Sequence, residues 1–406
     1  MSGAGRQTDH ADRARGNRLA ILVAFFKLGL TSFGGPTAHI AYFRNDLVVR
    51  RQWLTEEQYA EIVTLCQLLP GPTSSQIGFA IGLKRAGPQG GVAAFTGFTA
   101  PSALIMFAFA AGLPLATGML SKALLHGLML VAVSVVAHAV LGMALSFWKT
   151  VASALIGISA LGVALLTPAA WVQPLLIVGG GLVGSLMLRE GSGDHSSTGW
   201  AFNMRSLISL GVFASLMAGL PLLATAGGQS WLEIAAGFYR AGAFVFGGGH
   251  VVLPLLEAET VGRGWLDQET FLAGYGIAQA VPGPLFTFAG YLGAVSNTGM
   301  QPYIAGLLAL IAIFLPGFLL VTSLLPVWRQ LRGIPSAIAA VAGANAAVVG
   351  LLSAALWDPV ICSAVFGPID LFLAGLGFTL LQIRTPTFIV IPAIVALSTG
   401  ATLLTG

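Results

Sequence analysis

The chain has 406 residues, of which 56% are hydrophobic and only 8% are charged, and its mean hydropathy is +0.86. This composition excludes a soluble globular protein, whose surface needs many more polar residues. The net charge is only +4, and no basic run is interleaved with aromatic residues, so nucleic-acid binding is not expected. The sequence therefore predicts an all-α polytopic membrane protein.

The chain begins with a polar segment, residues 1–18, which carries four arginines and has no small-residue cleavage site. This pattern predicts a cytoplasmic tail rather than a signal peptide. A window of about 20 residues then marks about 13 apolar spans, and the polar stretch 189–205 reads as a linker. The spans lie near residues 19–43, 56–83, 91–115, 120–147, 151–167, 171–188, 206–226, 231–256, 267–297, 303–326, 337–356, 361–382 and 386–404.

A six-residue motif recurs in the two halves of the chain. Gln67-Leu68-Leu69-Pro70-Gly71-Pro72 is matched by Gln279-Ala280-Val281-Pro282-Gly283-Pro284, at an offset of 212 (279 − 67). Proline removes a backbone donor and glycine adds freedom, so each Pro-Gly-Pro triplet is expected to break a helix inside the membrane. The motif divides the chain into a first transmembrane repeat, 19–188, a linker with a connecting span, 189–230, and a second repeat, 231–406.

Further matched pairs support this division. Phe33-Gly34-Gly35 is echoed by Phe246-Gly247-Gly248, and Lys27 by Arg240, both at an offset of 213 (240 − 27). If the connecting span crosses once, an odd number of spans separates the repeats, and the second repeat has inverted topology. Inverted repeats with broken helices in matching positions are typical of secondary transporters.

The distribution of positive charge predicts a cytoplasmic N-terminus. Most Lys and Arg residues, Lys84 and Arg85 among them, then lie in inner loops, but Arg44, Arg50 and Arg51 are placed in an outer loop. This cluster opposes the positive-inside rule. A re-entrant hairpin at 56–83, in place of a broken span, is the alternative that it leaves open.

The two motifs also suggest a binding site for a tetrahedral oxyanion. The half-helix that begins after each Pro-Gly-Pro presents unpaired amides, the positive end of its dipole and nearby hydroxyls. Consecutive glycines can expose further amides in a concavity. The alternatives are that the hydroxyls only cap kinked helices and that the glycines only allow close packing. The candidate substrate-binding residues are Lys27, Gly34, Gly35, Gln67, Gly71, Thr73, Ser74, Ser75, Arg240, Gly247, Gly248, Gln279, Gly283 and Thr287.

Two cations stand out among these residues. Lys27 and Arg240 lie inside apolar spans, where a charge is costly unless it faces a cavity or a partner, so both are expected to supply charge to the anion. The alternative for Lys27 is that its long side chain reaches the membrane surface. Glu61, His39 and His250 are the candidates for proton coupling, whereas Glu257 and Glu259 are interpreted as marking the end of a span.

The chain carries no metal-ligand spacing and no soluble-enzyme motif, so neither a cofactor nor an enzymatic activity is expected. The segments Phe33–Pro36 with His39, 67–72, Phe246–His250, Pro254–Glu257 and 279–284 resemble the chromate ion transporter (CHR) family, long-chain bidomain type.

This resemblance implies export of chromate from the cytoplasm across the inner membrane, resistance to chromate, and coupling to the proton-motive force. The partners expected are chromate or a sulfate-like oxyanion, protons and the lipid bilayer, with a homodimer left open. Uptake or exchange of sulfate or another oxyanion is the main alternative. A lipid-acting membrane enzyme or scramblase is a remote one.

Overall fold

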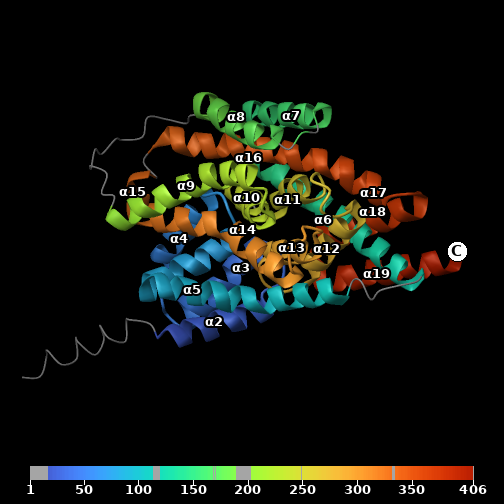
Figure 1. Cartoon of the computed structure of the whole chain (residues 1–406), viewed down its shortest axis with the longest axis horizontal. Helices are drawn as coiled ribbons and strands as arrows, with labels where there is room; N and C mark the ends of the chain where they lie inside the picture. The colour runs from blue at the N-terminus through green and yellow to red at the C-terminus, as the bar shows by residue number, and fades with distance from the viewer. Residues whose placement is uncertain are drawn as a thin grey trace, which may run out of the picture.

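The computed structural model describes residues 17–112, 119–167, 169, 171–188, 203–247, 249–331 and 334–405. Within these ranges the secondary structure is helical, without a strand, as predicted. In Figure 1 the long helices α5, α14 and α16 run along the long axis, with α2 at one edge and α7 and α8 at the other. Five described helical segments are long and apolar enough to cross a membrane: Thr73–Gly112, Lys122–Phe147, Met204–Gly227, Pro302–Val327 and Pro335–Ala364.

The first apolar segment folds back on itself. Helix α2 (Arg18–Thr31) ends at Ser32, and α3 (Gly35–Phe43) follows, continued by the π-helical η1 (Arg44–Arg50). The rings of Phe25 and Phe43 lie edge to face with centroids 5.5 Å apart. Along a straight helix these two residues would be about 27 Å apart. The segment is therefore a hairpin with its tip at residues 32–34, whereas the sequence suggested one continuous span.

The Pro-Gly-Pro segment that follows is also a hairpin. Helix α4 (Glu56–Leu68) leads to Pro70–Pro72, and α5 (Thr73–Gly112) leads away. Arg85 Nη1 donates to the carbonyl oxygen of Trp53 at 3.2 Å, which brings the two ends of the segment together. The hairpin that the sequence left open as an alternative is therefore the observed arrangement.

Helix α5 consists of two limbs. Its backbone is not helical at Ala86 and Gly87, and Gly82 packs directly against the backbone of Gly90. The first limb, 73–85, therefore returns to the base of the hairpin, and the second limb, 88–112, runs the other way.

The second half of the chain also forms two hairpins, and an ion pair between Arg240 and Glu259 joins the limbs of the first. Asn297 N–H donates to Trp265 O at 2.8 Å, and Tyr291 Oη donates to Thr270 O at 3.0 Å, so both ends of the segment 267–297 meet. Pro282–Pro284 thus forms another tip. The elements are α10 (Ser230–Ala243), η3 (Gly249–Val251), α11 (Val252–Thr260), α12 (Gln268–Ala280), η4 (Leu285–Thr287) and α13 (Phe288–Val295).

The remaining helices surround the hairpins. Helix α16 packs closely on α7 and α8 because glycines such as Gly180, Gly184 and Gly343 let the backbones touch. The bounds are α6 (Met119–Phe147), α7 (Val151–Leu166), α8 (Val172–Met187), α9 (Met204–Gly227), α14 (Pro302–Leu324), η5 (Leu325–Val327), α15 (Trp328–Leu331), α16 (Pro335–Ala355), η6 (Leu356–Ile361), α17 (Cys362–Ala364), α18 (Pro368–Gln382) and α19 (Thr387–Thr405).

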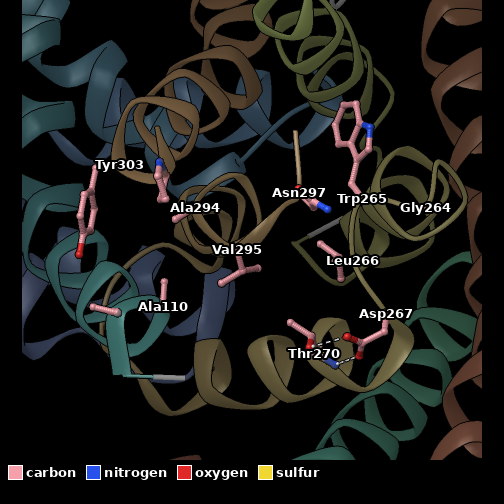
Figure 2. Close-up of a pocket in the computed structure, with 12 residues that line it drawn as sticks. Ala110, Gly264, Trp265, Leu266, Asp267, Thr270, Ala294, Val295, Asn297 and Tyr303 are labelled. Carbon is pink, nitrogen blue, oxygen red and sulfur yellow. Dashed lines mark hydrogen bonds between the residues drawn. The ribbon is translucent and has the colours of Figure 1, made fainter. Parts of the chain in front are cut away.

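Two cavities mark opposite ends of the hairpin region. One, of about 440 Å³, lies between the start of α4, the end of the first limb of α5 and the end of α14, and we call this side the first end. The other, of about 750 Å³, lies between Ala110 and Ala111 of α5, the loop 264–267 and the start of α14 (Figure 2). We call this side the second end. The second limb of α5 and helix α14 therefore run in opposite directions, and the two Pro-Gly-Pro hairpins start from opposite ends.

The fold-back corrects the predicted loop assignment. The guanidinium groups of Arg51 and Arg85 both lie over the Trp53 ring, 5.4 and 4.5 Å from its centroid. The prediction that these two arginines lie on opposite sides of the membrane is therefore wrong. Because the segments 19–43 and 56–83 each return to their starting side, the cluster of Arg44, Arg50 and Arg51 no longer opposes the other charges.

Candidate functional site

The four hairpin tips meet at one place in the molecule, where a Cβ on Gly249 would lie within 4 Å of both Leu285 and Pro36. The N–H of Gly71 donates to Val245 O at 2.7 Å, and the N–H of Gly283 donates to Ser32 O at 2.9 Å. Each bond joins a Pro-Gly-Pro tip of one half to the glycine-rich tip of the other half. We call this region, residues 32–35, 70–72, 244–247 and 282–284, the tip junction.

The Pro-Gly-Pro sequence suits this bond. Proline has no N–H, so the glycine holds the single backbone donor of each triplet, and that donor makes the crosswise bond. Gly71 has a φ of 122° and Gly283 a φ of 99°, which side chains rarely tolerate. A Cβ on Gly71 would lie 2.9 Å from Gln76 Nε2, and one on Gly283 would lie 3.0 Å from Ser102 Oγ. Glycine is therefore required at both tips.

The two long antiparallel helices support the junction. Ser102 of α5 lies beside Gly283, and Gly317 of α14 lies beside Gly71. Each follows a proline inside its helix, Pro101 or Pro316. Proline kinks a helix and leaves a carbonyl without its intrahelical donor. Gln76 Nε2 donates to Pro70 O at 2.8 Å and reaches Gly317 O at 3.4 Å, so it ties the tip to α14.

Several buried polar groups around the junction lack a protein partner. Ser75 is only 2% exposed and Ser32 is fully buried, yet neither hydroxyl has a hydrogen-bond partner within the described residues. The same holds for Oε1 of the buried Gln76. Buried polar atoms in native proteins are nearly always satisfied, so unpaired ones near a helix N-terminus suit a bound polar ligand. The two hydroxyls can donate to an oxyanion, whereas Gln76 Oε1 is an acceptor and needs a donor of its own.

The other uncharged candidates fall into two groups. Ser74 is buried and Thr73 half-buried in the first turn of α5, while Thr287 uses its hydroxyl to donate to Pro284 O at 2.9 Å. The Thr287 hydroxyl is thus used in a local bond to the backbone and caps no helix N–H. The rest lie toward the edges of the tips: Gly34 and Gln67 are exposed, and Gly35, Gly247 and Gln279 are half-buried, whereas Gly248 lies outside the described residues.

The two predicted cations do not form a symmetric pair. The Lys27 side chain is exposed on α2, four residues before the end of that helix. Arg240 forms an ion pair with Glu259, its Nε donating to Oε1 at 2.7 Å, and Arg263 pairs with the other carboxylate oxygen at 3.0 Å. Arg240 is therefore paired inside its own hairpin, with a carboxylate that it shares with Arg263. The proposed role of both cations in anion binding stays a prediction.

Sequence reasoning missed the acidic partners in these hairpins. Glu259 is buried between two arginines, and Asp46 pairs with Arg50 at 3.2 Å and with Arg51 at 2.6 Å. Asp46 and Glu259 are offset by 213 residues (259 − 46), as are Lys27 and Arg240. The same repeat that revealed the cations therefore contained the signal for the acids.

The predicted coupling residues lie in three different places. His39 is buried, and its Nε2 lies 3.2 Å from Ser32 O, the carbonyl that also accepts from Gly283. Since a carbonyl only accepts, Nε2 carries the proton, and Nδ1 has no partner in the described part of the chain. His250 Nδ1 lies 2.9 Å from Tyr275 Oη, and Glu61 lines the cavity at the first end. His39 is thus the candidate in direct contact with the junction.

No group of three or more His, Cys, Asp or Glu side chains is placed to hold a metal ion in the ranges that the structure describes. The donors at the junction are hydroxyls, amides and backbone N–H groups. This set suits an anion rather than a cation.

Comparison with known proteins gives a consistent result. The family model described as chromate transporter matches residues 19–185 and 232–401. A probable chromate transport protein of Synechococcus elongatus is 31% identical over 82% of this chain and 82% of its own length. Chromate transport proteins of Pseudomonas aeruginosa and Cupriavidus metallidurans are 28% and 27% identical, over 73% and 83% of this chain and 70% and 81% of theirs. No solved structure matches the chain.

Proposed function

Because the chain belongs to the chromate transporter family, we propose that it is a secondary transporter that exports chromate from the cytoplasm. Chromate is a tetrahedral dianion, and the tip junction offers uncharged donors that suit such a ligand. Export through the inner membrane, with the N-terminus in the cytoplasm, would give resistance to chromate. The crosswise backbone bonds between the tips of the two halves are the observation that carries this proposal.

The transport mechanism that we propose uses two inverted repeats. The hairpins that end at Pro70–Pro72 and Pro282–Pro284 would re-enter the membrane from opposite faces and meet near its middle. Support comes from their bases, which lie at opposite ends of the region, and from the antiparallel course of α5 and α14. Transporters of this kind bind substrate near the midplane, where broken helices point their N-termini at it.

Each crosswise bond would then act as a removable contact between the halves. When one hairpin rocks, the bond from Gly71 or from Gly283 opens on one side, and the anion reaches the junction from that side alone. The hydroxyls of Ser75 and Ser32 would bind the oxyanion without neutralising its charge. A site of this kind holds the ion weakly enough to release it after the conformational change.

Proton coupling would involve His39. Its Nδ1, for which the described residues provide no partner, can accept a proton, and this would place a positive charge next to Ser32 O and the Gly283 tip. The protonation state of His39 would thereby be linked to the affinity of the junction for the dianion. The exposed Lys27 and the paired Arg240 would contribute at longer range only.

Chromate uptake into inverted membrane vesicles tests the proposal. The parent chain should accumulate chromate, and Ser75→Ala should lower the initial rate about tenfold, because it removes a donor to a charged ligand worth about 1.5 kcal/mol or more. Ser185→Ala is the matched control, since that hydroxyl is exposed and bonds only within α8. Vesicles that take up sulfate and not chromate would identify a sulfate carrier instead, and a parent-like rate for Ser75→Ala would remove that hydroxyl from the site.

A further inference from the structure

The cavity at the first end has an unusual lining for an apolar protein. Its volume is about 440 Å³, and it lies at the base of the hairpin that carries Pro70–Pro72. Lys84 comes from the end of the first limb of α5 and Arg205 from the start of α9, and both side chains are exposed. Glu61 is the single acidic residue among the described residues that line it. These described residues therefore carry an excess of positive charge.

Uncharged hydrogen-bond donors line the same cavity as these cations. Trp328 lines the cavity and is only 3% exposed, and its Nε1 has no partner in the described part of the chain. An indole N–H can only donate, and leaving such a donor buried and unpaired is costly. The side-chain amides of Gln58 and Asn203 line the same cavity. Cationic groups and N–H donors around one space are what an oxyanion requires.

The cavities at the second end differ in charge. In the larger one, of about 750 Å³, no Lys or Arg appears among the described lining residues (Figure 2). Its acidic residue, Asp267, accepts bonds from Thr270 N and Oγ1 at 2.7 and 3.0 Å (Figure 2). A neighbouring cavity of about 650 Å³ is lined by both Lys122 and Glu269, whose opposite charges cancel. An anion is thus attracted to the first end more strongly than to the second.

We propose that the cavity at the first end is a loading site for a tetrahedral oxyanion, with Lys84, Arg205 and Trp328 Nε1 as its donors. This inference rests on the proposed function for the onward path to the tip junction. The same two helices connect the two places, because α4 and the first limb of α5 line the cavity at one end and hold Pro70–Pro72 at the other. Binding at the base can therefore bias the hairpin that must move.

The KM for chromate, measured with chromate supplied on the side of the first end, tests the loading site. Lys84→Gln and Arg205→Gln should each raise KM for chromate about fivefold, the effect of about 1 kcal/mol for one partly exposed charge, and leave kcat within about twofold. Trp328→Phe keeps the ring and should raise KM about threefold. Lys149→Gln removes an exposed cation that does not line the cavity, and it should behave like the parent.

Equilibrium binding of radiolabelled chromate to the purified protein separates this inference from the proposed function. The double variant Lys84→Gln/Arg205→Gln should weaken binding at least tenfold even if the protein transports nothing. If both single variants keep the parental KM and the double variant keeps the parental affinity, the cavity is not a loading site.

A lipid phosphate has the same chemistry as a free oxyanion, so the lipid composition must be varied. In vesicles of phosphatidylcholine alone, the loading site should still show the KM effect of Lys84→Gln. If that effect appears only when phosphatidylglycerol is present, the cavity binds a lipid headgroup, and the proposed loading of chromate is wrong.

Discussion

Replacing Gly71 by alanine tests the tip junction at its narrowest point. A Cβ there would meet Gln76 Nε2 at 2.9 Å and the Cα of Gly317 at 3.2 Å, while φ stays at 122°. The Gln76 amide can move, but only by giving up its bond to Pro70 O, and the Gly317 backbone cannot. The substitution therefore acts on the tip and on its contact with α14 together.

The cost follows from these contacts. A side chain at a strongly positive φ costs about 1–3 kcal/mol, and the lost hydrogen bond of Gln76 adds about 1 kcal/mol. Together these effects destabilise the closed junction by about 3 kcal/mol. The population of the closed junction then falls roughly 150-fold. Gly35→Ala provides a graded comparison, because its φ is 76° but nothing lies within 4 Å of the new Cβ. The Gly35→Ala variant should lower the initial rate of chromate uptake about tenfold.

The assay is the initial rate of chromate uptake in inverted vesicles, normalised to the amount of inserted protein. Gly211→Ala is the matched control, since this glycine lies in the helical α9 and its Cβ would meet nothing within 4 Å. It should transport like the parent. A Gly71→Ala protein that inserts normally and transports at the parental rate would refute the reasoning about the junction.

Three further predictions concern stability, measured as thermal unfolding in detergent. Glu259→Gln leaves two arginines facing each other beside a buried site, and it should lower the free energy of unfolding by about 3 kcal/mol; an unchanged melting temperature would show that the ion pairs are not formed. Asp370→Ala removes the bonds to His126 Nε2 and to the N–H of Phe366, both 2.9 Å, at a cost of about 2 kcal/mol. Gly343→Val should separate α8 from α16 and cost about 3 kcal/mol, while Gly179→Val, with open space around it, should be tolerated.

The sequence predicted the breaks better than the path between them. Proline and glycine at 70–72 and 282–284 act locally, through a missing N–H and a free φ, so the breaks could be located without any tertiary information. Whether the chain continues or turns back after a break depends on contacts such as that of Arg85 with Trp53, which are distant in sequence. The arginine cluster at 44–51 was the one local sign of the turn.

The candidate site was predictable in part for the same reason. The repeat located the glycines that form the crosswise bonds, but Ser32 and Val245, their acceptors, carry no signal because the bond uses only backbone oxygen. The role of Arg240 was also beyond local reasoning. Its partner Glu259 comes from the return limb of the hairpin, and a helix end explained that acid equally well until the limbs were seen together.

The location of a heavy oxyanion bound to the protein tests the central claim most directly. Tungstate is a tetrahedral dianion like chromate, and its tungsten atom is visible in an electron cryo-microscopy map of the protein in lipid nanodiscs. The account predicts tungstate density at the tip junction, between the Gly71 and Gly283 tips and beside Ser75. Density confined to sites away from all four tips, in a preparation that transports chromate, would contradict it.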